Sequence, residues 1–160
     1  RYYCEVVEDG NPIYWDEEFA KGSEYGRVIA PPASLFSLTF QPFWTPDFVK
    51  QKTASDVKAL STGDAESAAP NAMSVVREYG YVTATVVGSQ MEYLEPFGPG
   101  DGRILTQGMT TDVSAPKKTR VGEGVFVTSV TEYRTEVGQR LVGRQTMTLM
   151  LYNADGPKKG

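Results

Sequence analysis

The sequence of 160 residues contains no histidine and only one cysteine, Cys4. A single thiol excludes a disulfide within the chain. Without histidine, a transition-metal site would need carboxylates alone, which is an unfavourable ligand set for such an ion. We therefore expect no metal and no resident cofactor. Because a lone thiol fits a reducing compartment, we expect a cytoplasmic protein.

Long apolar runs and long basic runs are also missing. No stretch approaches the ~20 apolar residues that a membrane-spanning helix needs, and no signal peptide is visible. The net charge is −4 and the isoelectric point is near 4.9, so we expect no basic surface that follows a phosphate backbone. These absences argue against a membrane or nucleic acid as a partner. The chain opens inside RYYCEVVEDG, as though within an element, and we expect a preceding piece to be missing.

The length and the composition, with 40% hydrophobic and 22% charged residues, are typical of one globular domain with a real core. We expect a single domain over residues 1–160 with an irregular insertion at about 45–79. The insertion is rich in Ala, Ser, Asp and Thr and poor in large apolar residues, so residues 53–72 should be its most mobile part. It could be a surface excursion or a lid over a site.

The first 30 residues predict two short helices. An apolar stripe favours a helix over residues 1–8, and Gly10 ends it. Asp16 is a typical N-cap for a second helix, which Gly22 ends. Residues 25–30 then form a brief loop or strand.

A buried helix is predicted after this segment. Pro31 and Pro32 suit the first turn of a helix, and residues 33–41, ASLFSLTFQ, are apolar nearly all round. Pro42 and Pro46 would end this helix after two to three turns.

From residue 80 onward, the apolar residues recur with the period of two that is typical of β-strands. Short turns separate four long runs, which favours an antiparallel meander. Gly122 and Gly124 are expected to form a bulge that bends the third run. One buried helix before such a sheet predicts an α+β fold in which the sheet wraps the helix. The four runs are YVTATVVGSQMEYLEPF, GRILTQGMTTDVSAP, RVGEGVFVTSVTEYRTEV and RLVGRQTMTLMLYNA.

Asp9, Asn11 and Tyr14 form the densest chemistry-like spacing in the chain. An aspartate and a tyrosine flanking a turn could act as a general-acid pair. A capped turn beside a packed tyrosine is the commoner outcome of this spacing, and both interpretations stay open on the residues alone.

Basic and aromatic clusters offer two further candidates. Lys117, Lys118 and Arg120 could hold a phosphate, although a solvated turn explains them equally simply. The aromatic residues in and after the predicted buried helix are expected in the core rather than around a ligand. They are Phe36, Phe40, Phe43 and Trp44.

Three segments resemble the MaoC-like hotdog hydratases. They are DGNPIYWDEEFA at residues 9–20, GRVIAPPA at 26–33 and YLEPFGPGD at 93–101. The resemblance covers nearly all of the chain outside the insertion. It implies a hotdog fold, in which an antiparallel sheet wraps one central helix, in a dimer or pseudo-dimer. It also implies addition or removal of water across the α,β double bond of acyl-CoA thioesters.

Two departures from the family pattern bear on activity. The family pairs an aspartate with a histidine five residues later; here Asp9 and Asn11 match, while Tyr14 stands at the histidine position. A phenol, with a pKa of about 10, is a poor base at neutral pH. Where the family has His-Gly at the start of its central helix, with a glycine N–H that polarises the thioester carbonyl, this chain has Pro31-Pro32. Proline has no N–H, so the resemblance implies a vestigial site.

The resemblance is greatest to the non-catalytic subunits of heteromeric MaoC-like hydratases, whose partner hotdog chain carries the intact Asp/His dyad. It implies a heterodimer or heterotetramer that binds acyl-CoA as substrate, with a bulky or steroid-derived acyl group. Two alternatives stay open: a homodimer that binds acyl thioesters or acts as a scaffold without turnover, and a self-sufficient thioesterase that uses Asp9 and Tyr14. The expected substrate-binding residues are Pro31, Pro32, Phe36, Phe40 and Trp44, and the candidates for binding the CoA phosphates are Lys117, Lys118 and Arg120.

Overall fold

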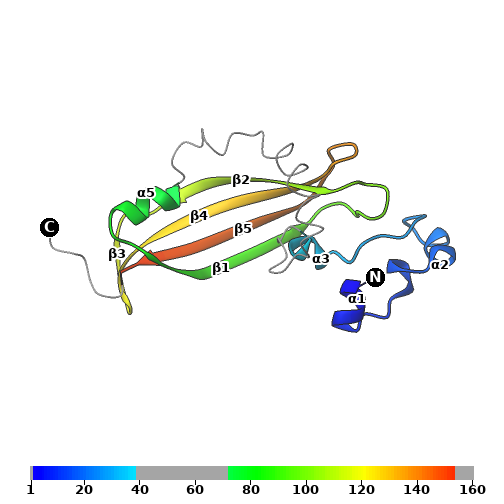
Figure 1. Ribbon diagram of the computed structural model, residues 1–160, viewed down its shortest axis with the longest axis horizontal. Helices are drawn as coiled ribbons and strands as arrows, with labels where there is room; N and C mark the ends of the chain where they lie inside the picture. The colour runs from blue at the N-terminus through cyan, green and yellow to red at the C-terminus, as the bar shows by residue number, and fades with distance from the viewer. Residues whose placement is uncertain (1, 39–71, 154–160) are drawn as a thin grey trace, which may run out of the picture.

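The structure, a computed structural model, describes residues 2–38 and 72–153 (Figure 1). Within these two ranges, five helical segments precede or flank one five-stranded antiparallel sheet. No helix within the described ranges is long and apolar enough to cross a membrane. The helical segments are α1 (Tyr2–Val7), η1 (Pro12–Tyr14), α2 (Glu17–Lys21), α3 (Ser34–Ser37) and α5 (Ala72–Glu78), and the strands are β1 (Thr83–Tyr93), β2 (Ile104–Val113), β3 (Lys117–Thr119), β4 (Gly122–Thr135) and β5 (Leu141–Tyr152).

The two predicted N-terminal helices are confirmed as α1 and α2. The Asp16 side chain caps α2 by accepting a hydrogen bond from the Phe19 N–H at 3.0 Å, and Gly22 is the C-cap. Glu17 lies in the first turn and Lys21 in the last. The negative charge is thus near the positive end of the helix dipole and the positive charge near its negative end, which stabilises the helix. Residues 25–30 form a loop rather than a strand.

The four long strands are confirmed, but the predicted meander is wrong. The strand order is β1-β5-β4-β2, so β1 pairs with β5 from Thr83↔Tyr152 to Tyr93↔Gly143, and β2 lies at the opposite edge (Figure 1). The physical reason is the length of the connection over residues 94–103. It is long enough to cross the ends of two strands spaced ~4.8 Å apart, whereas a hairpin needs a tight turn.

The predicted bulge at Gly122–Gly124 is also wrong. These residues pair regularly with β3, from Thr119↔Gly122 to Lys117↔Gly124, where the sequence predicted only a turn. Gly122 has a φ of +119° because it belongs to the turn of the β3–β4 hairpin. The register shifts lie elsewhere, between Val86 and Gly88, between Thr110 and Asp112, and between Tyr133 and Arg134.

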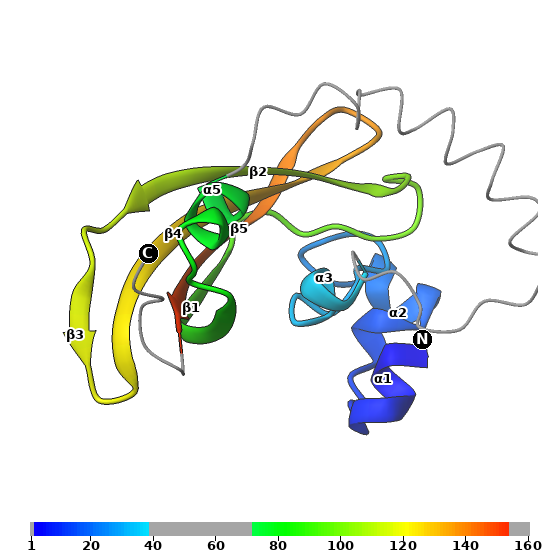
Figure 2. The same cartoon turned by 60° about the vertical axis from the view of Figure 1, so that its left-hand side comes forward.

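The core lies on the concave side of the sheet, where Figure 2 shows the strands curving around the side that carries α3 and α5. At one end, Leu35 of α3 packs in a buried cluster with Phe97, Tyr133 and Val142. At the other end, Val76 of α5 packs in a second cluster with Val125, Val127 and Leu151. Helices packed on one face of an antiparallel sheet confirm the predicted α+β class.

The predicted buried helix is shorter and less buried than expected. α3 ends at Ser37, with Leu38 as its C-cap, so its described part is one turn. Only one side of that turn is buried: Leu35 is fully buried, whereas Phe36 is 36% and Leu38 57% exposed. Ala33, its N-cap, offers no side-chain hydrogen bond, and a four-residue helix gains little from propagation.

Several predictions concern residues outside the described ranges. They are residues 39–41 of the predicted helix, the candidates Phe40, Phe43 and Trp44, the prolines Pro42 and Pro46, and most of the insertion at 45–79. The last part of that insertion is described, and it is the regular helix α5.

Close packing of α3 on the sheet predicts a sensitive position at Gly143. A Cβ atom there would overlap the Leu35 side chain and lie 3.1 Å from the Glu92 carbonyl oxygen. We expect Gly143→Ala to lower the free energy of unfolding by about 1–3 kcal/mol, measured by urea denaturation. Gly108→Ala in β2 is the matched control, since the added methyl meets only Thr131 Oγ1 at 3.5 Å. Equal stability of the two variants would contradict this packing.

Candidate functional site

The side chains of Asp9 and Asn11 are used to build a turn. Asp9 Oδ1 accepts a hydrogen bond from the Asn11 N–H at 3.1 Å, and Asn11 Oδ1 accepts one from the Ile13 N–H at 3.2 Å. Asn11 thereby caps η1, and Pro12 occupies its first turn. The structure therefore shows a capped turn, which was the commoner of the two interpretations of this spacing.

Asp9 and Tyr14 do not line the same hollow. Asp9 borders a hollow that is also lined by Cys4, Glu8 and Trp15, whereas Tyr14 lines two others. Burial raises the pKa of the Tyr14 phenol above its ordinary value, and the negative charge of Asp9 raises it further. The phenol therefore stays protonated at neutral pH and cannot act as a base.

An apolar groove of about 350 Å³ runs between the motif segment, by which we mean residues 9–33, and the loop at residues 97–104 that leads into β2. It brings together Tyr14 and Pro31, two residues that the resemblance placed in one site. Pro32 and Phe36 are exposed, and neither is among its lining residues. We call it the apolar groove, and it is lined chiefly by Tyr14, Ile29, Pro31, Leu38, Phe97 and Ile104.

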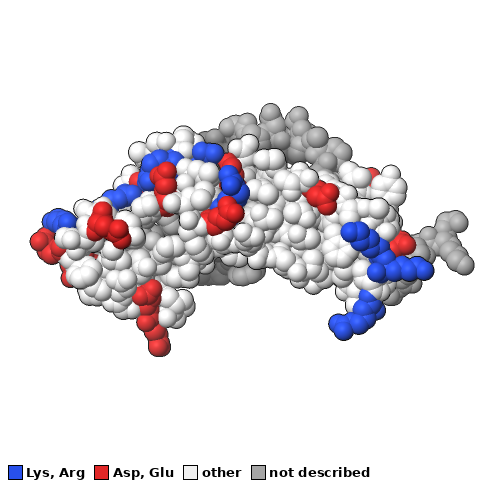
Figure 3. Space-filling model, turned by 180° about the vertical axis from the view of Figure 1, so that it is seen from behind, with Lys and Arg blue, Asp and Glu red and all other residues white. Residues whose placement is uncertain are grey.

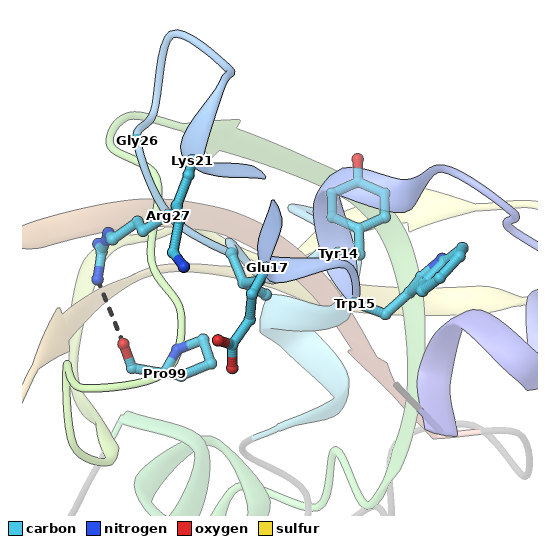
Figure 4. A pocket seen from close by; sticks show the side chains of 8 residues that line it. Tyr14, Trp15, Glu17, Lys21, Gly26, Arg27 and Pro99 are labelled. Atoms are coloured by element: carbon cyan, nitrogen blue, oxygen red, sulfur yellow. Dashed lines mark hydrogen bonds between the residues drawn. The ribbon is translucent and has the colours of Figure 1, made fainter. Parts of the chain in front are cut away.

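A second, more polar hollow of about 450 Å³ adjoins this groove (Figure 4). We call it the cationic hollow, because Lys21 and Arg27 face one carboxylate, Glu17, among its lining residues. In Figure 4, Lys21 and Glu17 extend from α2 toward Arg27 and Pro99. Arg27 Nη1 donates a hydrogen bond to the Pro99 carbonyl at 3.4 Å.

The groove and the cationic hollow are neighbours with a common wall. Tyr14, Val28 and Pro99 line both of them. The apolar groove extends from this wall to Pro31, and the cationic hollow extends from it to Lys21. Each hollow lies in the volume range that is usual for a small-molecule site.

Asp101 connects the two segments that line both hollows, residues 27–30 and residues 97–101. It is 7% exposed, and its Oδ2 accepts hydrogen bonds from Arg27 Nη2 and from the Gly98 N–H, both at 2.8 Å. Arg140 Nη2 lies 2.9 Å from Asp101 Oδ1, as an ion pair without a well-aligned hydrogen bond. A further hydrogen bond joins the same segments, from the Ala30 N–H to the Phe97 carbonyl at 2.6 Å.

The pKa of Asp101 reflects these contacts. Burial alone would raise it, but Arg27, the Gly98 N–H and Arg140 together hold the pKa below its usual range. Asp101 is therefore an anion that fixes Arg27, and through it the wall of the cationic hollow.

The basic residues predicted to bind the CoA phosphates lie elsewhere. Lys117 and Lys118 belong to β3, which lies at the opposite end of the sheet from α2 (Figure 1). Figure 3 shows a group of basic side chains at the β3 end, whereas basic and acidic side chains are mixed at the other end. Lys117 Nζ stands 5.6 Å from the centre of the Phe126 ring, and the structure brings none of the three basic residues to Tyr14.

Sequence reasoning missed Lys21, Arg27 and Asp101. Two of them lie inside segments that carry the family resemblance, Arg27 in GRVIAPPA and Asp101 in YLEPFGPGD. The pairing itself has no local signal, because the two residues are 74 positions apart.

A long antiparallel sheet that curves around helices, with the DGNPIY turn and the GPGD loop at one end, is the arrangement of a hotdog domain. The family model for the FAS1-like dehydratase domain region matches residues 1–144. The chain belongs to this family, among the MaoC-like hotdog proteins.

Relatives and solved structures agree with this assignment. A probable enoyl-CoA hydratase alpha subunit from Thermomonospora curvata is 28% identical over 159 residues, covering 99% of this chain and 44% of that protein. The chain thus spans less than half of that relative's length. The ChsH1–ChsH2 complex from Mycobacterium tuberculosis matches with a TM-score of 0.67 at 20% identity, over 99% of this chain and 77% of that one. A MaoC-like dehydratase from Rhodospirillum rubrum matches with a TM-score of 0.54 at 16% identity, over 95% and 80%. These two structures confirm the hotdog fold.

Proposed function

We propose that this chain is the non-catalytic, substrate-binding subunit of a heteromeric, cytoplasmic enoyl-CoA hydratase. The observation that carries the proposal is the state of the motif residues. Asp9 Oδ1 and Asn11 Oδ1 accept hydrogen bonds within a local turn, and Tyr14 presents a protonated phenol to a different hollow. No histidine exists to replace it.

The apolar groove supports a role in binding the acyl group. It combines the buried Pro31 with the aromatic walls of Tyr14 and Phe97, which suits a bulky group such as a steroid-derived side chain. Pro32 has no N–H to donate to the thioester oxygen, so this half supplies surface rather than chemistry.

A second hotdog subunit would supply the Asp/His dyad. The relative from T. curvata is named an alpha subunit, which supports an assembly with at least one further chain. We propose pairing through an edge strand of the sheet. Both outer strands, β1 and β2, expose apolar side chains that a partner strand would cover: Val86, Val87 and Met109.

Reconstitution tests this proposal. The chain alone is expected to show no hydration of a 2-enoyl-CoA, whereas the chain co-expressed with a hotdog subunit encoded beside it should be active. Removing the histidine of the partner's dyad should abolish turnover. Asp9→Asn in this chain keeps the acceptor for the Asn11 N–H, so it should leave kcat within about twofold.

Three outcomes would count against the proposal. Robust turnover by the isolated chain, with contaminating hydratases excluded, would show that it carries its own dyad. A loss of more than about 100-fold in kcat on Asp9→Asn would show that this carboxylate takes part in proton transfer. A native mass that matches a homodimer, with binding but no turnover, would favour the scaffold function instead.

A further inference from the structure

We propose that the cationic hollow binds the phosphates of the acyl-CoA, while the acyl chain extends along the apolar groove. The inference rests on the proposed function and adds a direction of binding. Lys21 and Arg27 would be the phosphate-binding residues.

The common wall of the two neighbouring hollows carries the first step. A ligand that fills both must be amphiphilic, because one end lies among Ile29, Pro31 and Phe97 and the other beside Lys21 and Arg27. An acyl-CoA is such a ligand, since a flexible pantetheine links its apolar acyl group to its phosphates. The shared wall of Tyr14, Val28 and Pro99 would then lie along that linker.

The fixed position of Arg27 carries the second step. Its side chain is 37% exposed, and its guanidinium is held by the buried carboxylate of Asp101 at 2.8 Å and by the Pro99 carbonyl. A guanidinium has five N–H donors, so donors remain for an anion on the open side. Because Asp101 has already ordered the side chain, a phosphate would bind there with little further loss of rotamer entropy.

The charges on α2 carry the third step. Lys21 lines the cationic hollow, although its Nζ lies 2.7 Å from Glu18, and both side chains of that pair are more than half exposed. An exposed pair of this kind is worth little, so a phosphate can compete for the ammonium group. Glu17, on the same helix, also lines the hollow, and its negative charge would repel a phosphate. Removing the charge of Glu17 should therefore strengthen phosphate binding.

The alternative cluster at β3 lies too far away to serve the same ligand on this chain. β3 pairs with the first residues of β4. Asp101 and Arg140 lie at the other end of β4, beyond its last residue, Thr135. At 3.3 Å per residue, the distance along β4 from Gly124 to Thr135 is about 36 Å. Lys117 therefore provides a charge-matched control.

The test compares two probes by isothermal titration calorimetry: decanoyl-CoA and decanoyl-pantetheine, which lacks the phosphates. The wild-type chain should bind decanoyl-CoA at least about tenfold more tightly. Lys21→Glu should remove most of that difference without changing the affinity for decanoyl-pantetheine. Glu17→Gln should tighten decanoyl-CoA binding severalfold, and Lys117→Glu should change neither affinity. Lys21→Gln, which leaves the C-terminal turn of α2 uncharged, should weaken decanoyl-CoA binding in the same direction, and a thermal melt checks that each variant folds.

Each contrary result has a defined meaning. Equal affinity for the two probes, an equal loss of both on Lys21→Glu, a larger effect of Lys117→Glu, or no binding to the wild-type chain would overturn the inference. The first three results leave the proposed function standing, since turnover of the reconstituted complex decides it, whereas absence of binding would also remove the substrate-binding part of that function. Conversely, turnover by the isolated chain would overturn the proposed function and leave the dependence on Lys21 intact.

Discussion

The Tyr14→His variant of the isolated chain is expected to show no measurable hydration of a soluble enoyl-CoA. An imidazole at this position would face the apolar groove, while the Asp9 carboxylate that should orient it borders another hollow and is engaged by the Asn11 N–H. General acid–base assistance is typically worth about 10²–10⁴-fold, and losing one oxyanion donor costs about 10²–10³ in rate. With Pro32 in place, the charge on the thioester oxygen has no amide donor at the start of α3, so the restored base has little transition state to act on.

The double variant Tyr14→His/Pro32→Gly should recover more activity than the sum of the two single changes. The base and the donor would act on one charge-separated state, so their effects are coupled. A double-mutant cycle on kcat/KM measures this coupling, with Tyr14→Phe as the control for the loss of the phenol alone. Appreciable activity from Tyr14→His by itself would contradict the assignment of the missing donor to Pro32.

Asp101→Asn is expected to lower the free energy of unfolding by about 2–3 kcal/mol at pH 7. Removing one partner of a buried ion pair typically costs about 3–5 kcal/mol, and the partial exposure of Arg27 and Arg140 reduces that value. Urea denaturation measures the change. Glu136→Gln is the control, because its pair with Arg103 is exposed and should contribute less than about 1 kcal/mol.

The effect of Asp101→Asn should depend on pH with a definite sign. The folded-state pKa of Asp101 is lowered, so the unfolded chain binds the proton more readily. The carboxylate therefore stabilises the fold fully above the unfolded pKa of about 3.9, and this contribution is lost as the pH falls through the folded pKa. The stability difference between wild type and variant should be largest near neutral pH and shrink below about pH 4. A constant difference down to acid pH would contradict the role of the charge.

The strands and short helices could be predicted because their signals are local. The β-rich run of residues 140–154 and the cap at Asp16 are set by neighbouring residues, and the strand β5 and the cap are both confirmed. Strand order has no such signal, since an alternating strand does not specify which of its two edges meets which partner. β3 has no local signal either. SAPKK at residues 114–118 has the composition of a turn, and its last residues form a strand only because they pair with the start of β4.

The candidate site divides in the same way. The family resemblance identified Tyr14 and Pro31, which the fold does bring to one groove. The hydrogen bond of Asp9 depends on which backbone N–H its carboxylate finds, and spacing alone does not decide this. The ion pair of Arg27 with Asp101 exists only after the GPGD loop reaches the motif segment.

The pairing of β1 with β5 has a consequence for synthesis on the ribosome. The partner of β1 is complete only when Tyr152 has been made, 59 residues after Tyr93. At about 5–20 residues per second, this interval is ~3–12 s. β4 and β5 join as a local hairpin at Arg134↔Leu141, but until then β1 has an open backbone edge that carries Val86 and Val87. The yield of folded protein is therefore expected to depend on the rate of translation through residues 94–152, and on chaperones that shield β1 while it waits.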